Sequence, residues 1–200
     1  MAGFPERLVR SALLDANTYE EVEADVSANR QAFVVVVLSG AAVGVGGIAN
    51  SGPEGILWQT LVAVVGWWIW AYATYFIGTR LLPTAETVAD PGQLLRTIGF
   101  SGAPGILRVT MLVPAIAFPA FIVFTLWELV AMVVAVRQAL DYRSTLRAMA
   151  VCAIGFPLYA IPQNVALSVP ATRPYSYAWL GGRAYVVDPA TSVVMADVTE

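Results

Sequence analysis

Residues 98–115 read IGFSGAPGILRVTMLVPA, and the fold of the chain depends on whether this stretch crosses a membrane. Its side chains are mostly apolar, but it is shorter than the about 20 residues that a helix needs to cross a bilayer core of about 30 Å. Gly102, Pro104 and Gly105 interrupt it, and Arg108 adds a charge. The pattern allows a crossing helix with a break, a re-entrant segment or a purely interfacial segment, so the flanking sequence has to decide.

The flanking sequence contains four longer apolar runs, each long enough for one crossing. They cover residues 31–50, 56–79, 117–137 and 146–166. The composition agrees with a membrane protein, because hydrophobic residues make up 58% of the chain and charged residues only 12%. A soluble domain carries about 25% charged residues. Lipid is therefore expected to cover much of the surface.

Arginine placement decides between the two topologies. The chain has no lysine, and loops rich in arginine or lysine remain on the cytoplasmic side. If residues 98–115 cross, eight of the eleven arginines lie inside, two lie in the C-terminal tail, and Arg108 lies within the membrane. Without that crossing, Arg137, Arg143 and Arg147 would lie outside. The sequence therefore predicts five crossings with a cytoplasmic N-terminus.

The predicted fold is an all-α integral membrane protein of the cell (inner) membrane with five transmembrane helices. Residues 1–30 form a cytoplasmic N-terminal segment, residues 31–166 the membrane domain, and residues 167–200 an extracytoplasmic tail. The N-terminal segment starts with a short amphipathic helix, in which apolar residues such as Leu8 and Val9 lie among charged ones. In the tail, two strand-like runs flank Gly181-Gly182, which is typical of a hairpin.

An acidic cluster follows the amphipathic helix, in the run TYEEVEAD at residues 18–25. Thr18 and Glu21 have the spacing of a capping box, which predicts that a helix starts here. The acids are spread around that helix and do not form a calcium loop with its central glycine. We therefore interpret them as a solvated helix face and not as a metal site.

The residue inventory excludes several kinds of chemistry. The chain has no histidine, and its one cysteine, Cys152, lies in an apolar run. A disulfide within the chain, a cysteine-based zinc site and a Ser-His-Asp triad are therefore impossible. The sequence has no run of basic residues, so nothing in it indicates nucleic-acid binding. We predict a protein that is not an enzyme and that has no cofactor and no bound metal.

Three blocks of sequence resemble a known family. They are LLDANTYEEVEADVSANRQAFVVVVLSG at 13–40, LLRTIGFSGAPGILRV at 94–109 and LWELVAMVVAVRQALDYRSTLRAMAVCAIGF at 126–156. Together they resemble the Yip-domain family (Ypt-interacting proteins), particularly its prokaryotic branch, over roughly residues 8–166. The resemblance implies a five-helix membrane protein with a cytoplasmic N-terminus. Eukaryotic relatives bind small GTPases in membrane trafficking, but prokaryotes lack that vesicle pathway. The tail after about residue 167 departs from the family.

Two charged residues are predicted to lie deep in the membrane domain. Arg108 is ten residues into the third span, and Glu128 is nine residues before Arg137, which gives both a depth of about 15 Å at 1.5 Å per residue. Antiparallel neighbouring helices would bring them to one level. Because an unpaired charge at this depth is costly, we expect a structural ion pair. An ion or proton relay is the alternative.

Small and aromatic residues mark further candidate contacts. Gly40 and Gly44 have the spacing that lets two helices approach closely, within the chain or between two copies. Gly102, Pro104 and Gly105 predict a helix break, a feature that can also form a transporter site. Aromatic residues crowd the second span, where packing or lipid contact competes with a pigment or quinone surface. Four aromatic residues of the tail are candidates for partner docking: Tyr175, Tyr177, Trp179 and Tyr185.

Two hypotheses about function follow. The first is a non-catalytic scaffold or accessory subunit that contacts the lipid bilayer and other membrane-protein subunits through its helices and tail. The alternative is a small transporter or channel component that uses the broken third span with Arg108 and Glu128.

Overall fold

The fold is described here from a computed structural model of the chain. It describes residues 2–48, 52–168, 176–180, 183–187 and 194–197. For residues 158–168, and for the strands apart from Tyr185 and Val194, the description is confined to the backbone. The helices are α1 (Phe4–Ala12), α2 (Ala16–Ala24), α3 (Ala28–Gly46), α5 (Glu54–Phe76), the π-helix η1 (Ile77–Leu81), α6 (Pro91–Ser101), the 3-10 helix η2 (Ala103–Leu112), α7 (Pro114–Ala139) and α8 (Thr145–Ser168).

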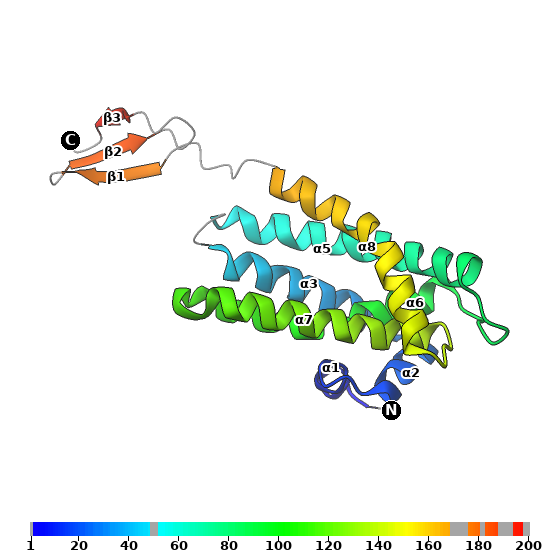
Figure 1. Ribbon diagram of the computed structural model, residues 1–200. Helices are drawn as coiled ribbons and strands as arrows, with labels where there is room; N and C mark the ends of the chain where they lie inside the picture. The colour runs from blue at the N-terminus through cyan, green and yellow to red at the C-terminus, as the bar shows by residue number, and fades with distance from the viewer. Residues whose placement is uncertain (1, 49–51, 169–175, 181–182, 188–193, 198–200) are drawn as a thin grey trace.

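Three of the described helical segments are long and apolar enough to cross a membrane. They are Ala28–Gly46, Glu54–Leu81 and Pro114–Ala139. Figure 1 shows α3, α5 and α7 lying alongside one another. Within the most apolar 18-residue stretch of α7, only 17% of the residues are buried, against 44% in each of the other two segments. Because this surface is apolar, α7 is the segment best suited to face lipid.

The segment from 98 to 115 is not one α-helix. α6 begins earlier, at Pro91, behind a capping box in which Asp90 accepts from the Gln93 amide and Gln93 accepts from the Asp90 amide. It ends at Ser101, and η2 takes over from Ala103. Pro104 has no amide hydrogen to give to an α-helical bond, so the chain continues in the tighter 3-10 form.

Close glycine contacts define the direction of each helix relative to α3. A side chain on Gly99 would lie 2.7 Å from Ala32 Cβ, and one on Gly46 would lie 2.5 Å from the Arg108 carbonyl oxygen. Residue numbers therefore rise together, and α6–η2 runs parallel to α3. A side chain on Gly40 would lie 2.7 Å from Ala63 Cβ. The Gly44 position meets Ile56 instead, so α5 runs antiparallel to α3.

Packing in the core relies on small residues and on polar contacts to the backbone. Ala32, Ala71 and Ala135 are fully buried. Trp67 is buried as well, and its indole nitrogen donates to the Leu95 carbonyl at 2.9 Å. Tyr142, in the loop after α7, donates to the Leu82 carbonyl at 2.7 Å. These contacts fix α5 to α6, and the loop after α7 to the loop after η1.

The C-terminal residues form three short strands in the order β1-β2-β3 (Figure 1). β1 (Ser176–Leu180) pairs antiparallel with β2 (Arg183–Val187), and β2 pairs antiparallel with β3 (Val194–Asp197). A bulge lies between Val186 and Val187. Of the proposed docking residues, Tyr175 lies outside the described residues, and only the backbone of Tyr177 and Trp179 is described. Tyr185 lies in β2 and is partly exposed.

Candidate functional site

The structure brings the two deep charges together. Arg108, on η2, and Glu128, on α7, form an ion pair with 2.5 Å between Nη2 and Oε2. Arg108 Nη2 also donates to Thr125 Oγ1 at 3.1 Å, and Ser39 Oγ donates to Glu128 Oε1 at 3.4 Å. The cluster therefore joins three helices: η2, α7 and α3.

The helix break has a second role at this cluster. Gly102 ends α6 and precedes η2 with ordinary helical dihedrals (φ −74°, ψ −4°). Gly105, one turn further on, has no side chain because one would overlap the Glu128 carboxylate and Ser39 Oγ. Pro104 is buried beside it. The glycine at 105 thus makes room for the Glu128 carboxylate between η2 and α3, a role that its spacing alone does not reveal.

Gly40 and Gly44 lie on the face of α3 that meets α5. The Gly40 position is 2.9 Å from the Thr60 Cα and 3.2 Å from the Gln59 carbonyl oxygen. Side chains at either glycine would collide with the α5 backbone, so the two helices are in backbone contact here. The close approach takes place within the chain, where it occupies this glycine face.

The aromatic residues of α5 divide between core and surface. Trp67 and Trp70 are buried, whereas Trp68 and Tyr72 are each 47% exposed. The exposed pair stacks with 5.7 Å between ring centroids. This stacked pair presents one flat aromatic surface on the outside of the helix.

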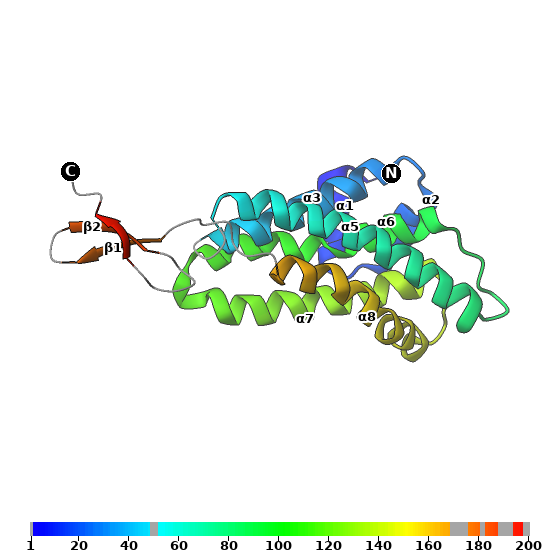
Figure 2. The same ribbon diagram turned by 90° about the horizontal axis from the view of Figure 1, so that it is seen from above.

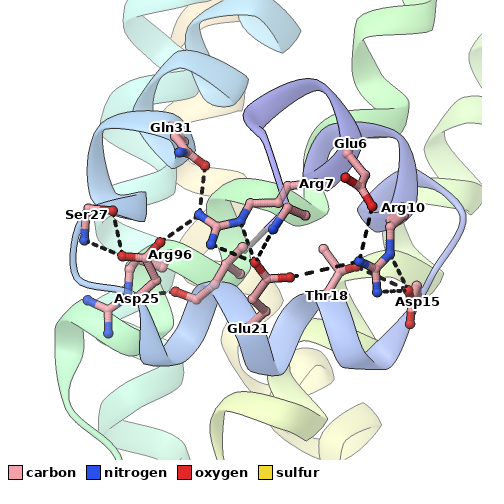
Figure 3. A network of polar contacts seen from close by, with 12 residues as sticks. Glu6, Arg7, Arg10, Asp15, Thr18, Glu21, Asp25, Ser27, Gln31 and Arg96 are labelled. Atoms are coloured by element: carbon pink, nitrogen blue, oxygen red, sulfur yellow. Dashed lines mark hydrogen bonds and ion pairs between the residues drawn. The ribbon is translucent and has the colours of Figure 1, made fainter.

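A polar network that the sequence analysis did not predict joins α1 to α2 and α3 (Figure 3). At its centre is Arg7, which is only 2% exposed. Its Nη2 and Nε donate to Glu21 Oε1 at 2.8 and 3.1 Å. Its Nη1 donates to Asp25 Oδ2 at 2.8 Å and to Gln31 Oε1 at 3.1 Å. One arginine therefore holds the amphipathic helix against the acidic helix and the first turn of α3.

Two interpretations of the acidic cluster are wrong. Thr18 does not begin the helix, because α2 starts at Ala16 and its N-cap is Asp15, which accepts from the Asn17 amide at 3.0 Å. Thr18 is fully buried. Glu21 and Asp25 do not lie on a freely solvated face, since both bind Arg7. Sequence spacing misled here because Asp15 and Thr18 are both good capping residues, and only packing against α1 selects Asp15.

A second buried arginine, in the middle of α6, joins this helix to α2. Arg96, 5% exposed, donates through Nε to the Val22 and Glu23 carbonyls at 3.0 Å each. These carbonyls lie in the last turn of α2, where a helix has unpaired acceptors and a negative dipole end. Arg96 also approaches Asn29 Oδ1 at 3.4 Å. The network therefore attaches α2 to the membrane helices.

The acids in and just after α2 differ in the direction in which their pKa is shifted. Hydrogen bonding from Arg7 holds the pKa of Glu21 below its usual range, and hydrogen bonds from Ser27 and Arg7 do the same for the pKa of Asp25. Burial raises the pKa of Glu23 to about 7, and the nearby charge of Asp141 adds to that rise. Among the described residues no group of acids, histidines or cysteines could hold a metal ion.

Comparison with known protein families identifies the chain. The model of the Yip1 domain matches residues 15–162, which is most of the chain. The protein belongs to the Yip1 domain family. No curated protein and no solved structure gives a significant match. Yip1 family proteins are membrane proteins that are not known as enzymes, in agreement with the apolar helices found here.

The limits of the match divide the chain in an informative way. The Yip1 domain covers α2 to most of α8 and includes the Arg108–Glu128 cluster and both glycine contacts. It begins after α1, so Arg7 lies outside it while the partners Glu21, Asp25 and Gln31 lie inside. The strands after α8 also lie outside it.

Proposed function

We propose that this Yip1 family protein crosses the cell (inner) membrane five times and acts as a non-catalytic scaffold or accessory subunit of a membrane complex. In this proposal the N-terminus and the loop between α7 and α8 are cytoplasmic, and the strands after α8 are extracytoplasmic.

The parallel run of α6–η2 beside α3 supports the third crossing. Its contacts extend from Ala32 at the inner end of α3 to Gly46 at the outer end. A re-entrant segment would return to the side on which it entered, whereas this one continues past Arg108 into Pro114, the start of the antiparallel α7. α8, a helix of 24 residues, is long enough to supply the fifth crossing.

The observation that carries the scaffold proposal is the way the two half-buried charges are used. Arg108 and Glu128 bind each other, and Thr125 and Ser39 complete the cluster. A transport site would need such groups to face a substrate, yet these hold three helices of the same chain together. Among the described residues, α7 has an apolar surface for lipid and for a neighbouring membrane subunit, on which Phe118 is 75% exposed.

The tail is proposed as the docking element for another subunit. β2 pairs with strands on both sides, so a partner strand would have to add at an outer edge, along β1 or β3. Tyr185, partly exposed on β2, is an aromatic side chain of the kind that dominates interfaces.

The test is purification of the tagged full-length protein from its native membrane in mild detergent. We expect a stoichiometric membrane partner, lost on truncation after Val169 while the truncated chain remains monodisperse. Ion or solute flux through liposomes that contain only the purified protein, abolished by Glu128→Gln, would contradict the proposal and favour a transporter. A truncated chain that aggregates would show that the tail belongs to the protein's own fold.

A further inference from the structure

Arg80 and Arg147 are exposed arginines that have no acidic partner among the described residues. Arg80 lies in the last turn of the π-helix η1, and Arg147 is the third residue of α8. The arginines that form the described ion pairs are Arg7, Arg10, Arg108 and Arg143. The charges of Arg80 and Arg147 are therefore available to an anion from outside the chain.

Arg147 is held against the segment that carries Arg80. Its Nη1 donates to the Pro83 carbonyl at 3.0 Å, three residues after Arg80. Its guanidinium also lies over the Tyr142 ring, 5.9 Å from the centroid, and the Tyr142 hydroxyl donates to the Gly78 carbonyl at 3.1 Å. Figures 1 and 2 show the end of α5 and the start of α8 at the same end of the bundle. The two charges therefore belong to one region of the surface.

The acidic side chains at this end of the bundle gather elsewhere. A polar depression of about 430 Å³ lies between α2, the end of α7 and the loops that follow η1 and α7, and its acidic lining residues are Glu20, Glu86 and Asp141. Glu86 is bound by Arg143, which lines the same depression. Neither Arg80 nor Arg147 lines it. The positive charge of these two arginines is therefore not cancelled by the acids nearby.

Large apolar side chains accompany the two arginines. Trp68, Tyr72 and Phe76 precede Arg80 at intervals of four residues and are 47, 47 and 57% exposed. This spacing puts them on one side of the helix. Leu146, in the first turn of α8, is 74% exposed. Since α5 and η1 together are long and apolar enough to cross a membrane, this exposed stripe is suited to lipid acyl chains.

The combination of cations and exposed apolar side chains selects the kind of ligand. A free phosphate compound, or an acidic loop of a soluble protein, would bind the charges but would leave Phe76 and Leu146 uncovered. A phospholipid has a phosphate at the membrane surface and acyl chains below it, which matches an arginine at the end of an apolar stripe. Basic residues at a membrane surface also favour anionic over zwitterionic head groups.

We propose that Arg80 and Arg147 bind the head-group phosphate of an anionic phospholipid, whose acyl chains lie along Tyr72 and Phe76. The planar guanidinium is well suited to phosphate, to which it can donate two parallel hydrogen bonds. The inference rests on the proposed function in one respect, namely that α5 and α8 cross the membrane. It goes beyond that function because it assigns a lipid of stated charge to one site.

Native mass spectrometry of the full-length protein in mild detergent tests the proposal. Phosphatidylglycerol and phosphatidylcholine with identical acyl chains are titrated separately, and the affinity for the first bound lipid is compared. The test variants are Arg80→Gln and Arg147→Gln. Arg143→Gln is the matched control, because Arg143 is also exposed but pairs with Glu86. Arg147→Lys keeps the charge and separates lipid binding from the bond to Pro83.

We expect the wild type to bind phosphatidylglycerol about tenfold more tightly than phosphatidylcholine. Each glutamine variant at 80 or 147 should bind phosphatidylglycerol about fivefold more weakly, with little change for phosphatidylcholine. Arg143→Gln and Arg147→Lys should remain within about twofold of the wild type. Raising ammonium acetate from about 0.1 M to about 1 M should reduce the preference, since salt screens exposed charges.

Equal affinity of the wild type for the two lipids, or an equal loss in Arg143→Gln, would overturn the inference. Competition by glycerophosphoglycerol, the soluble head group, at the same concentration as the lipid would also overturn it, since the apolar stripe would then contribute nothing. Loss of a native protein partner from Arg80→Gln, with lipid affinity unchanged, would assign the arginine to a protein contact instead.

A separate measurement distinguishes failure of this inference from failure of the proposed function. Leu61→Cys, in a Cys152→Ser background, should resist a water-soluble maleimide in vesicles, because Leu61 is exposed on a helix that is proposed to cross the membrane. Rapid labelling at 61 would show that α5 is not in lipid, and the proposed membrane topology itself would fail. Protection at 61 together with equal affinity for the two lipids would overturn only the lipid site.

Discussion

Leu14 shows how one residue sets the path of the N-terminal segment. Its φ of +64° is left-handed, a conformation that a leucine rarely adopts. The turn it makes ends α1 and reverses the chain, so that α2 folds back and brings Glu21 and Asp25 to Arg7. No sequence signal marks this turn, because glycine or asparagine would normally be expected there. The arginine network could therefore not be predicted from the sequence.

The Arg108–Glu128 pair was predictable at the same scale. Two depths calculated from helix rise placed the charges at one level, and the structure has them in contact. What the sequence could not provide was the contribution of Ser39, since the level of α3 depends on how closely α3 packs against η2.

Removing one member of the pair should be more harmful than removing both. Glu128→Leu leaves Arg108 charged without its partner among apolar side chains, and we expect it to destabilise the protein by about 3–5 kcal/mol. The double change Arg108→Leu/Glu128→Leu should recover most of that loss. Thermal unfolding in detergent, followed by circular dichroism for the wild type, both single variants and the double variant, gives the coupling.

A double variant as unstable as Glu128→Leu would show that the charges do not act as a pair. A double variant that is stable but no longer binds the native partner would show that the pair has a functional role.

Glu23 should make the stability of the protein depend on pH. Burial raises its pKa in the folded protein to about 7, above the ordinary value of 4.5. The stability that the protonated form contributes is fully present below the ordinary value and is lost as the pH rises through about 7. The wild-type melting temperature should therefore fall between about pH 5 and pH 8.

The matched variant is Glu23→Gln, which keeps the shape and cannot ionise. Its melting temperature should change less over the same pH range, and the difference between the two proteins should develop mainly between about pH 4.5 and pH 7. Parallel pH curves for Glu23→Gln and the wild type would assign the dependence to another group. Asp25→Asn removes the ion pair of a carboxylate whose native pKa is lowered, so it should lower the melting temperature by a similar amount across this pH range and serves as the control.

At the scale of elements, the helices were easier to predict than their ends. Apolar runs marked α3, α5 and α7 because length and hydropathy suffice for a membrane helix. The end of α6 and the start of η2 followed from Gly102 and Pro104. The parallel packing of α6–η2 on α3 could not be derived, since it depends on which small residues meet across the two helices.

Gly105 and Gly102 are expected to differ sharply in their tolerance of a side chain. Gly105→Ala would force a methyl group into the Glu128 carboxylate and should cost about 1–3 kcal/mol, as overpacking does. A methyl group on residue 102 would have its nearest neighbour, the Gly99 carbonyl oxygen, at 3.3 Å. Gly102→Ala should therefore destabilise the protein much less. Unfolding temperatures of the two variants in one detergent compare them.

Equal losses at the two positions would mean that the helix break, and not the space for the carboxylate, is what each glycine provides. A Gly105→Ala loss that persists when Glu128→Ala and Ser39→Ala are both added would also argue against the proposed overlap.

At the scale of the whole molecule, the sequence was enough to predict a helical membrane protein and its family. Composition and long apolar runs established the first, and the Yip1 domain match confirmed the second. The number of crossings depends on one interrupted segment, residues 98–115. A topology experiment in the membrane tests the proposed five crossings.

Cysteine accessibility in intact cells would test that topology. In a Cys152→Ser background, Asn17→Cys and Ser144→Cys should resist a membrane-impermeant maleimide until the cells are permeabilised. Ser192→Cys, in the tail, should react at once, because an odd number of crossings puts the tail on the opposite side from the N-terminus. Both Asn17 and Ser144 are exposed, so their protection would come from the membrane.

Immediate labelling of Ser144→Cys together with protection of Asn17→Cys would place the α7–α8 loop outside and remove the third crossing. Loss of labelling at all three positions would instead indicate burial in a complex, which denaturation before labelling would reveal.

The contact between Arg108 and Glu128 also has a consequence for biogenesis. Arg108 is synthesised twenty residues before Glu128, so η2 leaves the ribosome with its charge uncompensated. A 3-10 segment with a bare arginine has little reason to enter lipid alone. If the proposed third crossing is correct, we expect η2 and α7 to enter the bilayer as one unit, against an α3–α5 hairpin already closed at Gly40 and Gly44.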